Sequence, residues 1–408
     1  MKTRTLIFIL SIWLFGTCLT YGIADDFEWP RWHGPNGDGI SNETNWDPEA
    51  LAGGPKILWK VDVGTGHSNV AIKDNRLYTM GGRSVYCLNA ETGAEIWQYS
   101  IERFTNFQTT PTIDGKYVFV LSKDGILLCF KAKNGKFRWQ KDLVNDLKSP
   151  KPLNGFASSP VIEGDLVILN AKTSGIALNK KTGDMIWEGE VNTDTIGRYF
   201  ATPVIYDHDG KRYALIFSHS GLFSMDVESG RMLWFYEWTK EGSPNVVDPM
   251  VFDNKVFISS SETDARCALI DIKGNEPSVL WENENLSNHI STSIYIDGYL
   301  YGIDGDYHKN IKDCSLRCID FKTGDIMWEK KMRGASLMAA DGKLIILEDD
   351  GTLRIAEATP SSYQEISSCD VFDSEQKFRQ FWTPPVLYKG KIYCRNYDGD
   401  LVCIDVSK

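Results

Sequence analysis

The sequence predicts an all-β fold, an eight-bladed β-propeller whose blades are four-stranded and antiparallel. Two observations predict it: a motif that recurs along most of the chain, and short apolar strands between its copies. A third observation, an isolated strand near the N-terminus, predicts how the ring closes. Closed all-β folds often exceed the length of an average domain, so 408 residues are compatible with one such ring.

The recurring motif runs, in outline, from an acidic or amide residue through Thr-Gly to a Trp. Five copies keep three residues between the Gly and the Trp, as from Gly93 to Trp97, and a looser sixth copy from Asp271 to Trp281 has three more. The spacing between successive Trp residues is 42 to 48 residues. This is the period of a four-stranded propeller blade rather than of a helical repeat. The six Trp residues are Trp97, Trp139, Trp187, Trp234, Trp281 and Trp328.

The segments between the motifs complete the count of blades. Residues 117–121 and 344–347 are short, apolar and rich in β-branched or aromatic side chains, as strands are. Residues 334–372 form a blade without the Trp, and we expect Ile366 at its position. Residues 381–408 hold only three strands. The orphan strand that carries Trp59 is expected to supply the fourth, which closes the ring and removes open sheet edges.

The first 24 residues have the features of a signal peptide. A basic start precedes an apolar run from Leu6 to Phe15, and small residues lead to a cleavage site at Ala24. The apolar run is too short to span a membrane. We therefore expect residues 1–24 to be removed on export to the periplasm or the medium. Residues 25–55 are then an N-terminal extension, and residues 56–408 are the propeller.

Two further predictions concern the cysteines. Lipoprotein processing at Cys18 is the less favoured alternative to cleavage at Ala24, because Phe15 and Thr17 fit a lipidation box poorly. The eight remaining cysteines are expected to be free and mostly buried thiols, although a bridge between Cys314 and Cys318 stays open. Four of them share one column of the repeat, where other blades have Ala or Ser, and equivalent positions in different blades lie too far apart to bond. This column contains Cys87, Cys129, Cys318 and Cys403.

At this point the chain resembles a known family. The Asp-x-x-Thr-Gly-x-x-x-Trp pattern is similar to the repeats of pyrroloquinoline-quinone-like (PQQ-like) β-propellers over residues 56–408. That family includes quinoprotein alcohol and sugar dehydrogenases, the lipoprotein of the bacterial outer-membrane assembly machine, and exported propellers of unassigned role. The segment from Trp29 to Gly39, Trp-Pro-Arg-Trp-His-Gly-Pro-Asn-Gly-Asp-Gly, resembles the N-terminal signature of the last group. Fold alone does not decide between these roles.

Several absences guide the choice among them. The dehydrogenases that the resemblance implies bind pyrroloquinoline quinone with calcium, but the sequence has no adjacent cysteine pair and no Cys-x-x-Cys-His haem site. No specific residue therefore supports that cofactor. The poor lipidation box and the N-terminal extension disfavour the assembly lipoprotein. A net charge of −11 argues against binding of nucleic acid, which requires a basic surface.

Candidate site residues lie on one predicted face. In a propeller, the segments that precede the innermost strands share a face with the loops between the second and third strands, and ligands favour that face. Residues there that depart from the repeat are the candidates. The first set contains His67, Gln108, Asn154, Arg198, Tyr199, Asn245, His289 and Arg379. The second contains Arg83, Lys123, Lys172, His219, Glu262, Asp304, Asp306 and His308.

Ligand binding is predicted for a subset of these candidates. Histidine serves as a general base or a metal ligand near neutral pH, and an Arg beside a Tyr suits an anionic or sugar ligand. The segment Asp304-Gly305-Asp306 resembles a fragment of a calcium loop, but a plain turn is the simpler reading. The predicted ligand-binding residues are His67, Arg198, Tyr199, His219, His289 and His308.

The sequence favours an exported propeller that binds a ligand or a protein and acts as a scaffold. Its partner is then a protein, a small molecule or a carbohydrate, and no catalytic residue is assigned. One alternative is a quinone-dependent alcohol or sugar dehydrogenase. A second is a polysaccharide-active enzyme that uses His, Tyr and Arg on the propeller face.

Overall fold

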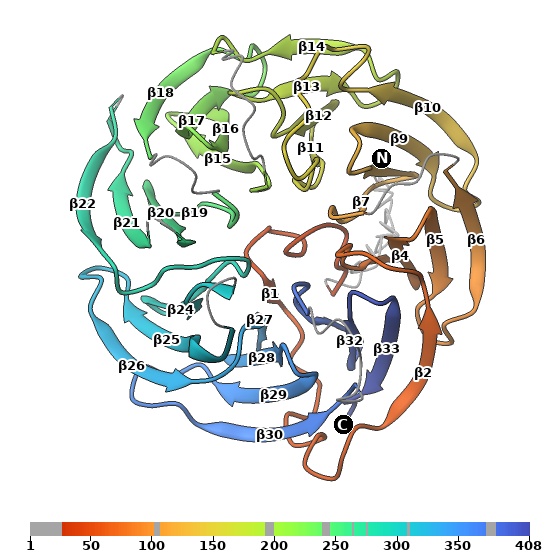
Figure 1. Ribbon diagram of the computed structural model, residues 1–408, viewed down its shortest axis with the longest axis vertical. Helices are drawn as coiled ribbons and strands as arrows, with labels where there is room; N and C mark the ends of the chain where they lie inside the picture. The colour runs from red at the N-terminus through yellow and green to blue at the C-terminus, as the bar shows by residue number, and fades with distance from the viewer. Residues whose placement is uncertain are drawn as a thin grey trace, which may run out of the picture.

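A computed structural model describes residues 27–101, 107–191, 200–238, 245–262, 265–274, 276–307, 311–372 and 381–408. In this part of the chain, eight sheets, each with four antiparallel strands, stand as blades around a central axis (Figure 1). The prediction of an all-β, eight-bladed propeller is therefore confirmed. Among the described residues, no helix has the length and apolar character that crossing a membrane requires.

Blades 1 to 7 run in chain order from β3 to β30, each from the axis to the rim, and blade 8 takes its outermost strand from the N-terminal part of the chain (Figure 1). Blade 1 consists of β3 (Ala71–Lys73), β4 (Arg76–Gly81), β5 (Ser84–Asn89) and β6 (Glu95–Ser100), and blade 2 of β7 (Thr112–Asp114), β8 (Tyr117–Leu121), β9 (Ile126–Lys131) and β10 (Phe137–Asp142). Blade 3 consists of β11 (Val161–Glu163), β12 (Leu166–Leu169), β13 (Ile176–Asn179) and β14 (Met185–Glu188), and blade 4 of β15 (Val204–His208), β16 (Lys211–Ser218), β17 (Gly221–Asp226) and β18 (Met232–Glu237). Blade 5 consists of β19 (Met250–Phe252), β20 (Lys255–Ser260), β21 (Arg266–Asp271) and β22 (Ser278–Asn283), and blade 6 of β23 (Ile294–Ile296), β24 (Tyr299–Asp304), β25 (Ser315–Asp320) and β26 (Ile326–Lys331). Blade 7 consists of β27 (Ala335–Ala340), β28 (Lys343–Glu348), β29 (Thr352–Glu357) and β30 (Glu365–Asp370), and blade 8 of β31 (Val386–Tyr388), β32 (Lys391–Arg395), β33 (Asp400–Asp405) and the N-terminal β2 (Ile57–Asp62).

The ring closes as predicted, through the N-terminal strand. β2 pairs with β33 and places Trp59 opposite Cys403. A buried arginine, Arg395, adds a second closure between blade 8 and blade 1. Its guanidinium donates hydrogen bonds to the carbonyl oxygens of Ser68 (2.6 Å), Met80 (2.6 Å) and Gly64 (2.9 Å), and to the Thr79 hydroxyl (2.8 Å). No carboxylate takes part in these bonds, and burial lowers the pKa of Arg395 to about 9.

The repeated Trp and Gly lock each blade to the next one. In blade 1, the Trp97 indole N–H donates to the Ala132 carbonyl of blade 2 at 2.9 Å. Gly135 lies under the same indole ring, and a β-carbon at that position would be only 2.7 Å from Trp97 Cδ2. The same kind of indole-to-carbonyl bond is made by Trp59, Trp97, Trp139, Trp187, Trp281 and Trp328. Trp234 faces blade 5, which has the looser copy of the motif, and makes no such bond among the described residues.

A belt of hydrogen bonds, here called the inner belt, joins the segments that precede the innermost strands. At each step a backbone N–H donates to a side-chain oxygen of the following blade. The steps are Asn69 to Thr110 (3.3 Å), Thr110 to Ser159 (2.9 Å), Ser159 to Thr202 (3.2 Å), Thr202 to Asp248 (2.6 Å) and Asp248 to Thr292 (3.1 Å). The recurrence of small polar residues at these positions therefore has a structural cause.

The cysteine prediction is confirmed for the described residues. All eight cysteines there are free thiols, including Cys314 and Cys318, and Cys369 alone among them is only partly buried. The shared column lies opposite the Trp of the outer strand, as in the pairs Cys87–Trp97 and Cys318–Trp328. A small side chain is needed there because the indole ring covers it. Burial raises the pKa of Cys87 to about 12, so the thiol stays protonated.

The expectation for blade 7 is wrong by one residue. The outer strand bulges there, and Ser367, not Ile366, lies opposite Ile355 at the position that Trp takes in other blades. The N-terminal extension substitutes for the missing indole. The Asp47 N–H donates to the Val406 carbonyl of blade 8 at 2.7 Å, and the Ser367 hydroxyl donates to the Pro48 carbonyl.

The extension continues along the inside of the ring (Figure 1). Its strand β1 (Ile40–Ser41) pairs in parallel with β27, so that blade 7 has five strands. Trp29 forms a bridge with Ile72 of blade 1. The Glu43 carboxylate accepts the N–H groups of Lys389 (2.6 Å) and Gly390 (2.8 Å) in the turn between β31 and β32. The extension is thus an integral part of the propeller.

Candidate functional site

His67 lies in the connection between β2 and β3 and has a structural environment. Its ring stacks on Trp382 with centroids 4.3 Å apart and is tilted against Tyr397 at 4.7 Å. Burial, reinforced by the nearby charges of Arg395 and Lys123, lowers the pKa of His67 to about 3. The imidazole is therefore neutral at physiological pH and joins the last blade to the first.

His219 lies in the turn between β16 and β17 of blade 4. Its Nε2 is 3.2 Å from the Ser220 hydroxyl, and burial lowers the pKa of His219 below its usual value. His67 and His219 therefore belong to different blades and to different surroundings. The structure does not join them into one constellation.

His289 is the predicted site residue that the structure brings together with other candidates. It lies in the connection between β22 and β23 with 3% of its surface exposed. Its Nε2 is 3.5 Å from Glu262 Oε1, and its Nδ1 is 3.3 Å from Asp306 Oδ1. The Tyr307 N–H also donates to Nδ1 at 3.2 Å. His289 thus ties the β20–β21 connection of blade 5 to the β24–β25 connection of blade 6.

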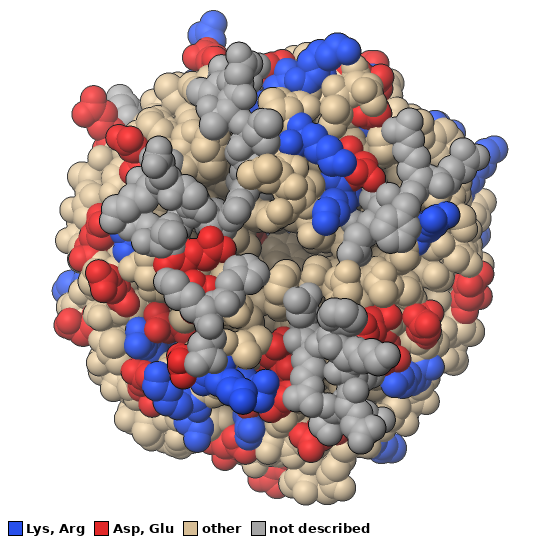
Figure 2. All heavy atoms as spheres, viewed as in Figure 1, with Lys and Arg blue, Asp and Glu red and all other residues tan. Residues whose placement is uncertain are grey.

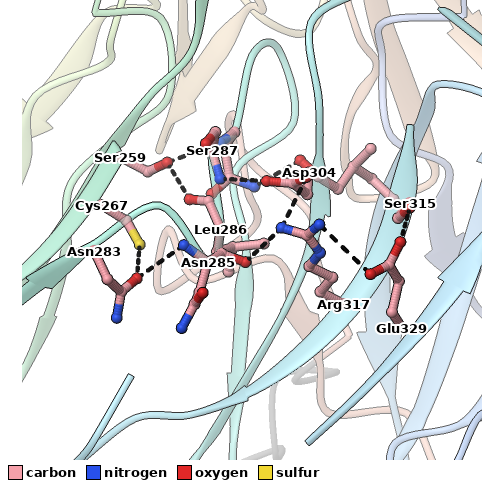
Figure 3. Close-up of polar contacts among 12 residues, drawn as sticks. Ser259, Cys267, Asn283, Asn285, Leu286, Ser287, Asp304, Ser315, Arg317 and Glu329 are labelled. Carbon is pink, nitrogen blue, oxygen red and sulfur yellow. Dashed lines mark hydrogen bonds and ion pairs between the residues drawn. The ribbon is translucent and has the colours of Figure 1, made fainter. Parts of the chain in front are cut away.

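A polar network fixes the segment that carries His289 (Figure 3). On one side, the Ser259 hydroxyl donates to the Leu286 carbonyl at 2.7 Å and accepts the Asn288 N–H at 2.7 Å. On the other side, the Asp304 carboxylate accepts the Ser287 N–H at 2.8 Å. We call Glu262, the segment 285–289 and Asp304 to Asp306 the blade 5–6 platform. Its backbone is held from both blades, so its side chains are preorganised.

Arg317 occupies the centre of this network (Figure 3). Its guanidinium is 2.9 Å from Asp304 Oδ2, 3.5 Å from Glu329 Oε2, and donates to the Asn285 carbonyl at 3.0 Å. Burial raises the pKa of Asp304, although the Ser287 N–H and Arg317 oppose that rise. Because it lies 2.9 Å from Arg317, Asp304 is engaged in an ion pair. Among the described residues, no group of three His, Cys, Asp or Glu side chains is arranged to hold a metal ion.

Charge is distributed unevenly on the face that Figure 2 shows. The face is hollowed at its centre, and acidic side chains gather beside the hollow over the sector of β19 to β24. Basic side chains lie across the hollow, near β11. A partner that docks on this face meets an acidic side and a basic side.

A turn before β11 exposes an apolar side chain. The Gly155 N–H donates to the Pro152 carbonyl at 2.9 Å, which closes the turn Pro152–Gly155 with Leu153 at its tip. Leu153 is 68% exposed, the largest value among the exposed large hydrophobic residues in the described part of the chain. The other twelve such residues all lie on outermost strands. Buried Phe156, whose N–H donates to the Lys123 carbonyl at 2.9 Å, anchors the turn.

The remaining predicted ligand-binding residues, Arg198, Tyr199 and His308, lie outside the described residues, as does Arg379. Sequence reasoning missed the Leu153 turn and the carboxylate of Asp248. The inner belt offered a signal for Asp248, since it has a charged residue where four other blades use a hydroxyl. The repeat motif does not mark Leu153, because the exposure of this side chain is visible only in the three-dimensional structure.

A closed ring of four-stranded blades, locked by a repeated Trp–Gly contact, defines the class as a PQQ-type β-propeller. The chain matches the family model described as "Outer membrane protein assembly factor BamB" over residues 50–283 and 109–330. Together these spans cover more than half of the chain, so the protein belongs to this family. The sequence analysis disfavoured similarity to the outer-membrane assembly lipoprotein, and the match to this family model does not support that prediction.

Individual relatives agree with this family. The chain is 24% identical to the outer membrane protein assembly factor BamB of Escherichia coli (strain K12) over 370 residues, which covers 73% of this chain and 88% of the relative. It is 21% identical to BamB of Yersinia pestis over 366 residues, or 85% of this chain and 77% of the relative.

Solved structures share the fold. BamB from Moraxella catarrhalis superposes with a TM-score of 0.66 at 16% identity, covering 86% of this chain and 99% of that one. The quinohemoprotein alcohol dehydrogenase of Comamonas testosteroni superposes with a TM-score of 0.70 at 10% identity, covering 93% of this chain and 80% of that one. At these identities the likeness concerns the fold alone.

Proposed function

We propose that this protein is an exported scaffold that binds a protein partner and takes part in the assembly of outer membrane proteins. The observation that carries the proposal is the match to the BamB family model over more than half of the chain, and Leu153, a largely exposed apolar side chain at the tip of an anchored turn, is the candidate contact. Burying this side chain against a partner surface removes apolar area from water, which favours contact. The relatives, which are named for outer membrane protein assembly, support the cellular role.

The surroundings of Leu153 suit a protein rather than a small substrate. Lys151 pairs with Asp124 beside the turn, and the acidic blade 5–6 platform lies in another sector of the ring. An apolar side chain beside an ion pair suits a protein–protein interface, where polar groups flank the apolar contacts. The described candidate histidines, by contrast, have separate structural partners: His67 stacks on Trp382, His219 contacts Ser220, and His289 lies beside Glu262. In this proposal residues 1–24 are an export signal, residues 25–55 are the extension, and residues 56–408 are the propeller.

The test is a deletion in the source bacterium with complementation. Loss of the gene should lower the amount of folded outer membrane proteins in the membrane fraction, and the wild-type gene should restore it. Leu153→Asp should restore it poorly at equal protein level, because the charge prevents burial of that side chain. Ile186→Asp is the matched control, since Ile186 is 49% exposed but lies on an outer strand. Unchanged outer membrane proteins in the deletion strain would contradict the proposal.

A further inference from the structure

A cleft of about 470 Å³ lies between the N-terminal extension and the inner strands of blades 2 to 4. Pro30 to Trp32 and Pro35 to Gly37 form the wall contributed by the extension. Residues of β7, β11 and β15 form the other wall, and Asp248 closes one side. None of the platform residues and no residue of the Leu153 turn lines it. Its volume is typical of a pocket for a small molecule.

Three of the five charged side chains that line the cleft already have partners. Asp114 pairs with Lys180 at 2.7 Å. Glu163 and Arg212 pair with each other, with Arg212 Nε 2.9 Å from Glu163 Oε1. The two that remain are Arg31 and Asp248, and neither has an ion pair among the described residues.

Arg31 has spare hydrogen-bond donors. Its Nε donates to the Gly34 carbonyl at 3.2 Å and one terminal nitrogen donates to the Pro35 carbonyl at 2.8 Å. These bonds shape the turn of the extension but use only two of the five N–H groups of a guanidinium. Because the fork of N–H groups matches a carboxylate, the remaining donors suit the acidic end of a ligand.

Asp248 brings an ionisable carboxyl group to a position where the inner belt requires only a neutral hydrogen-bond acceptor. A neutral hydroxyl accepts the belt hydrogen bond at Thr110, Ser159, Thr202 and Thr292. Asp248 uses Oδ1 for the belt and Oδ2 to accept the Trp32 indole N–H at 2.7 Å. The residue is only 8% exposed, and burying a carboxylate without a cation is unfavourable. A cationic group in the cleft would offset that cost.

We propose that this cleft binds a short zwitterionic peptide, with its carboxylate on Arg31 and its ammonium group on Asp248. Trp32 links these two residues, since it follows Arg31 in the chain and its indole N–H donates to Asp248. Apolar side chains such as Ile113 and Val161 line the wall opposite the extension and accommodate small side chains of the peptide. This site shares no lining residue with the Leu153 turn.

The experiment is calorimetric titration of the processed protein with trialanine. Trialanine should bind saturably, with a dissociation constant in the micromolar to low millimolar range, about 10⁻⁶ to 10⁻³ M. Its N-acetylated form and its C-terminal amide should each bind at least about tenfold more weakly, because each lacks one charged end. The absence of saturable binding by trialanine up to about 10 mM, or equal binding of the blocked peptides, would overturn the proposal.

Variants assign the two ends. Arg31→Gln should weaken binding of trialanine about tenfold without affecting the already weak binding of the amide. Asp248→Asn should also weaken binding of trialanine about tenfold, without affecting the already weak binding of the N-acetylated peptide. Asp114→Asn is the control, because this carboxylate lines the cleft but is paired with Lys180, and binding should change less than about twofold. If a variant fails to fold, the blocked peptides on the wild-type protein still decide.

Discussion

The contact between Trp97 and Gly135 allows a quantitative test of how the blades are locked together. Gly135 has a φ of +65°, and a β-carbon there would lie 2.7 Å from Cδ2 and 2.8 Å from Cε3 of Trp97. In Gly135→Ala, the left-handed backbone conformation costs about 1–2 kcal/mol. Displacing a packed indole ring adds about 1–3 kcal/mol. The expected loss of unfolding free energy is therefore about 2–5 kcal/mol.

Gly115→Ala is the matched control. Gly115 also has a positive φ, +52°, but a β-carbon there meets no atom within 4 Å. Only the backbone cost of about 1–2 kcal/mol applies. The assay is urea denaturation of both variants and the wild type, with equal denaturant slopes as the condition for comparing midpoints. If Gly135→Ala is within about 0.5 kcal/mol of Gly115→Ala, the contact with Trp97 does not lock the blades.

Three further predictions concern ring closure, pH and the thiols. Arg395→Met should lower the unfolding free energy by at least about 3 kcal/mol, because four buried acceptors lose their donor. The control, Arg212→Met at an exposed ion pair, should lower it by less than about 1 kcal/mol. Similar losses for both variants in urea denaturation would refute this prediction. Burial raises the pKa of Asp248 to about 7, above the unfolded value of about 3.9, so the folded state holds this proton more tightly. The free energy of unfolding should therefore fall as the pH rises from about 4 to about 7. The fall is at most about 4 kcal/mol, and Asp248→Asn should flatten it; an unchanged pH profile of the unfolding midpoint would contradict the assignment. Cys369 should react first with a thiol-specific dye in the native protein, and all eight thiols that follow Cys18 should react after denaturation without a reductant. Fewer reacting thiols would reveal a disulfide.

Most of the fold could be predicted from the sequence because its repeat is local and its consequences are periodic. The Gly-x-x-x-Trp spacing fixes the outer strand, and the position of Trp59 fixes the closure. The error at Ile366 arose because blade 7 lacks the Gly-x-x-x-Trp spacing that marks this position in other blades, so the residue that follows the bulge could not be counted from the sequence. Nothing in the local sequence of blade 7 indicates that Asp47 supplies the missing hydrogen bond, since that contact joins distant segments.

The site was less predictable because a residue's place on a connection does not reveal its burial. His67 and His289 were found on the predicted connections, but one is stacked between blades and the other is enclosed by two carboxylates. Leu153 follows a proline in a polar segment, and only the turn that closes at Gly155 makes it the tip of a rigid loop. Side-chain exposure depends on contacts between blades, which a single repeat does not encode.

The measurement that tests protein binding most directly is site-specific photo-cross-linking in living cells of the source bacterium. A photoreactive amino acid at position 153 should give a covalent adduct with one defined outer-membrane protein partner. The same amino acid at Ile186, an exposed apolar position on the rim, should give none. Equal adducts at both positions, or none at position 153, would contradict the conclusion that this face docks a protein.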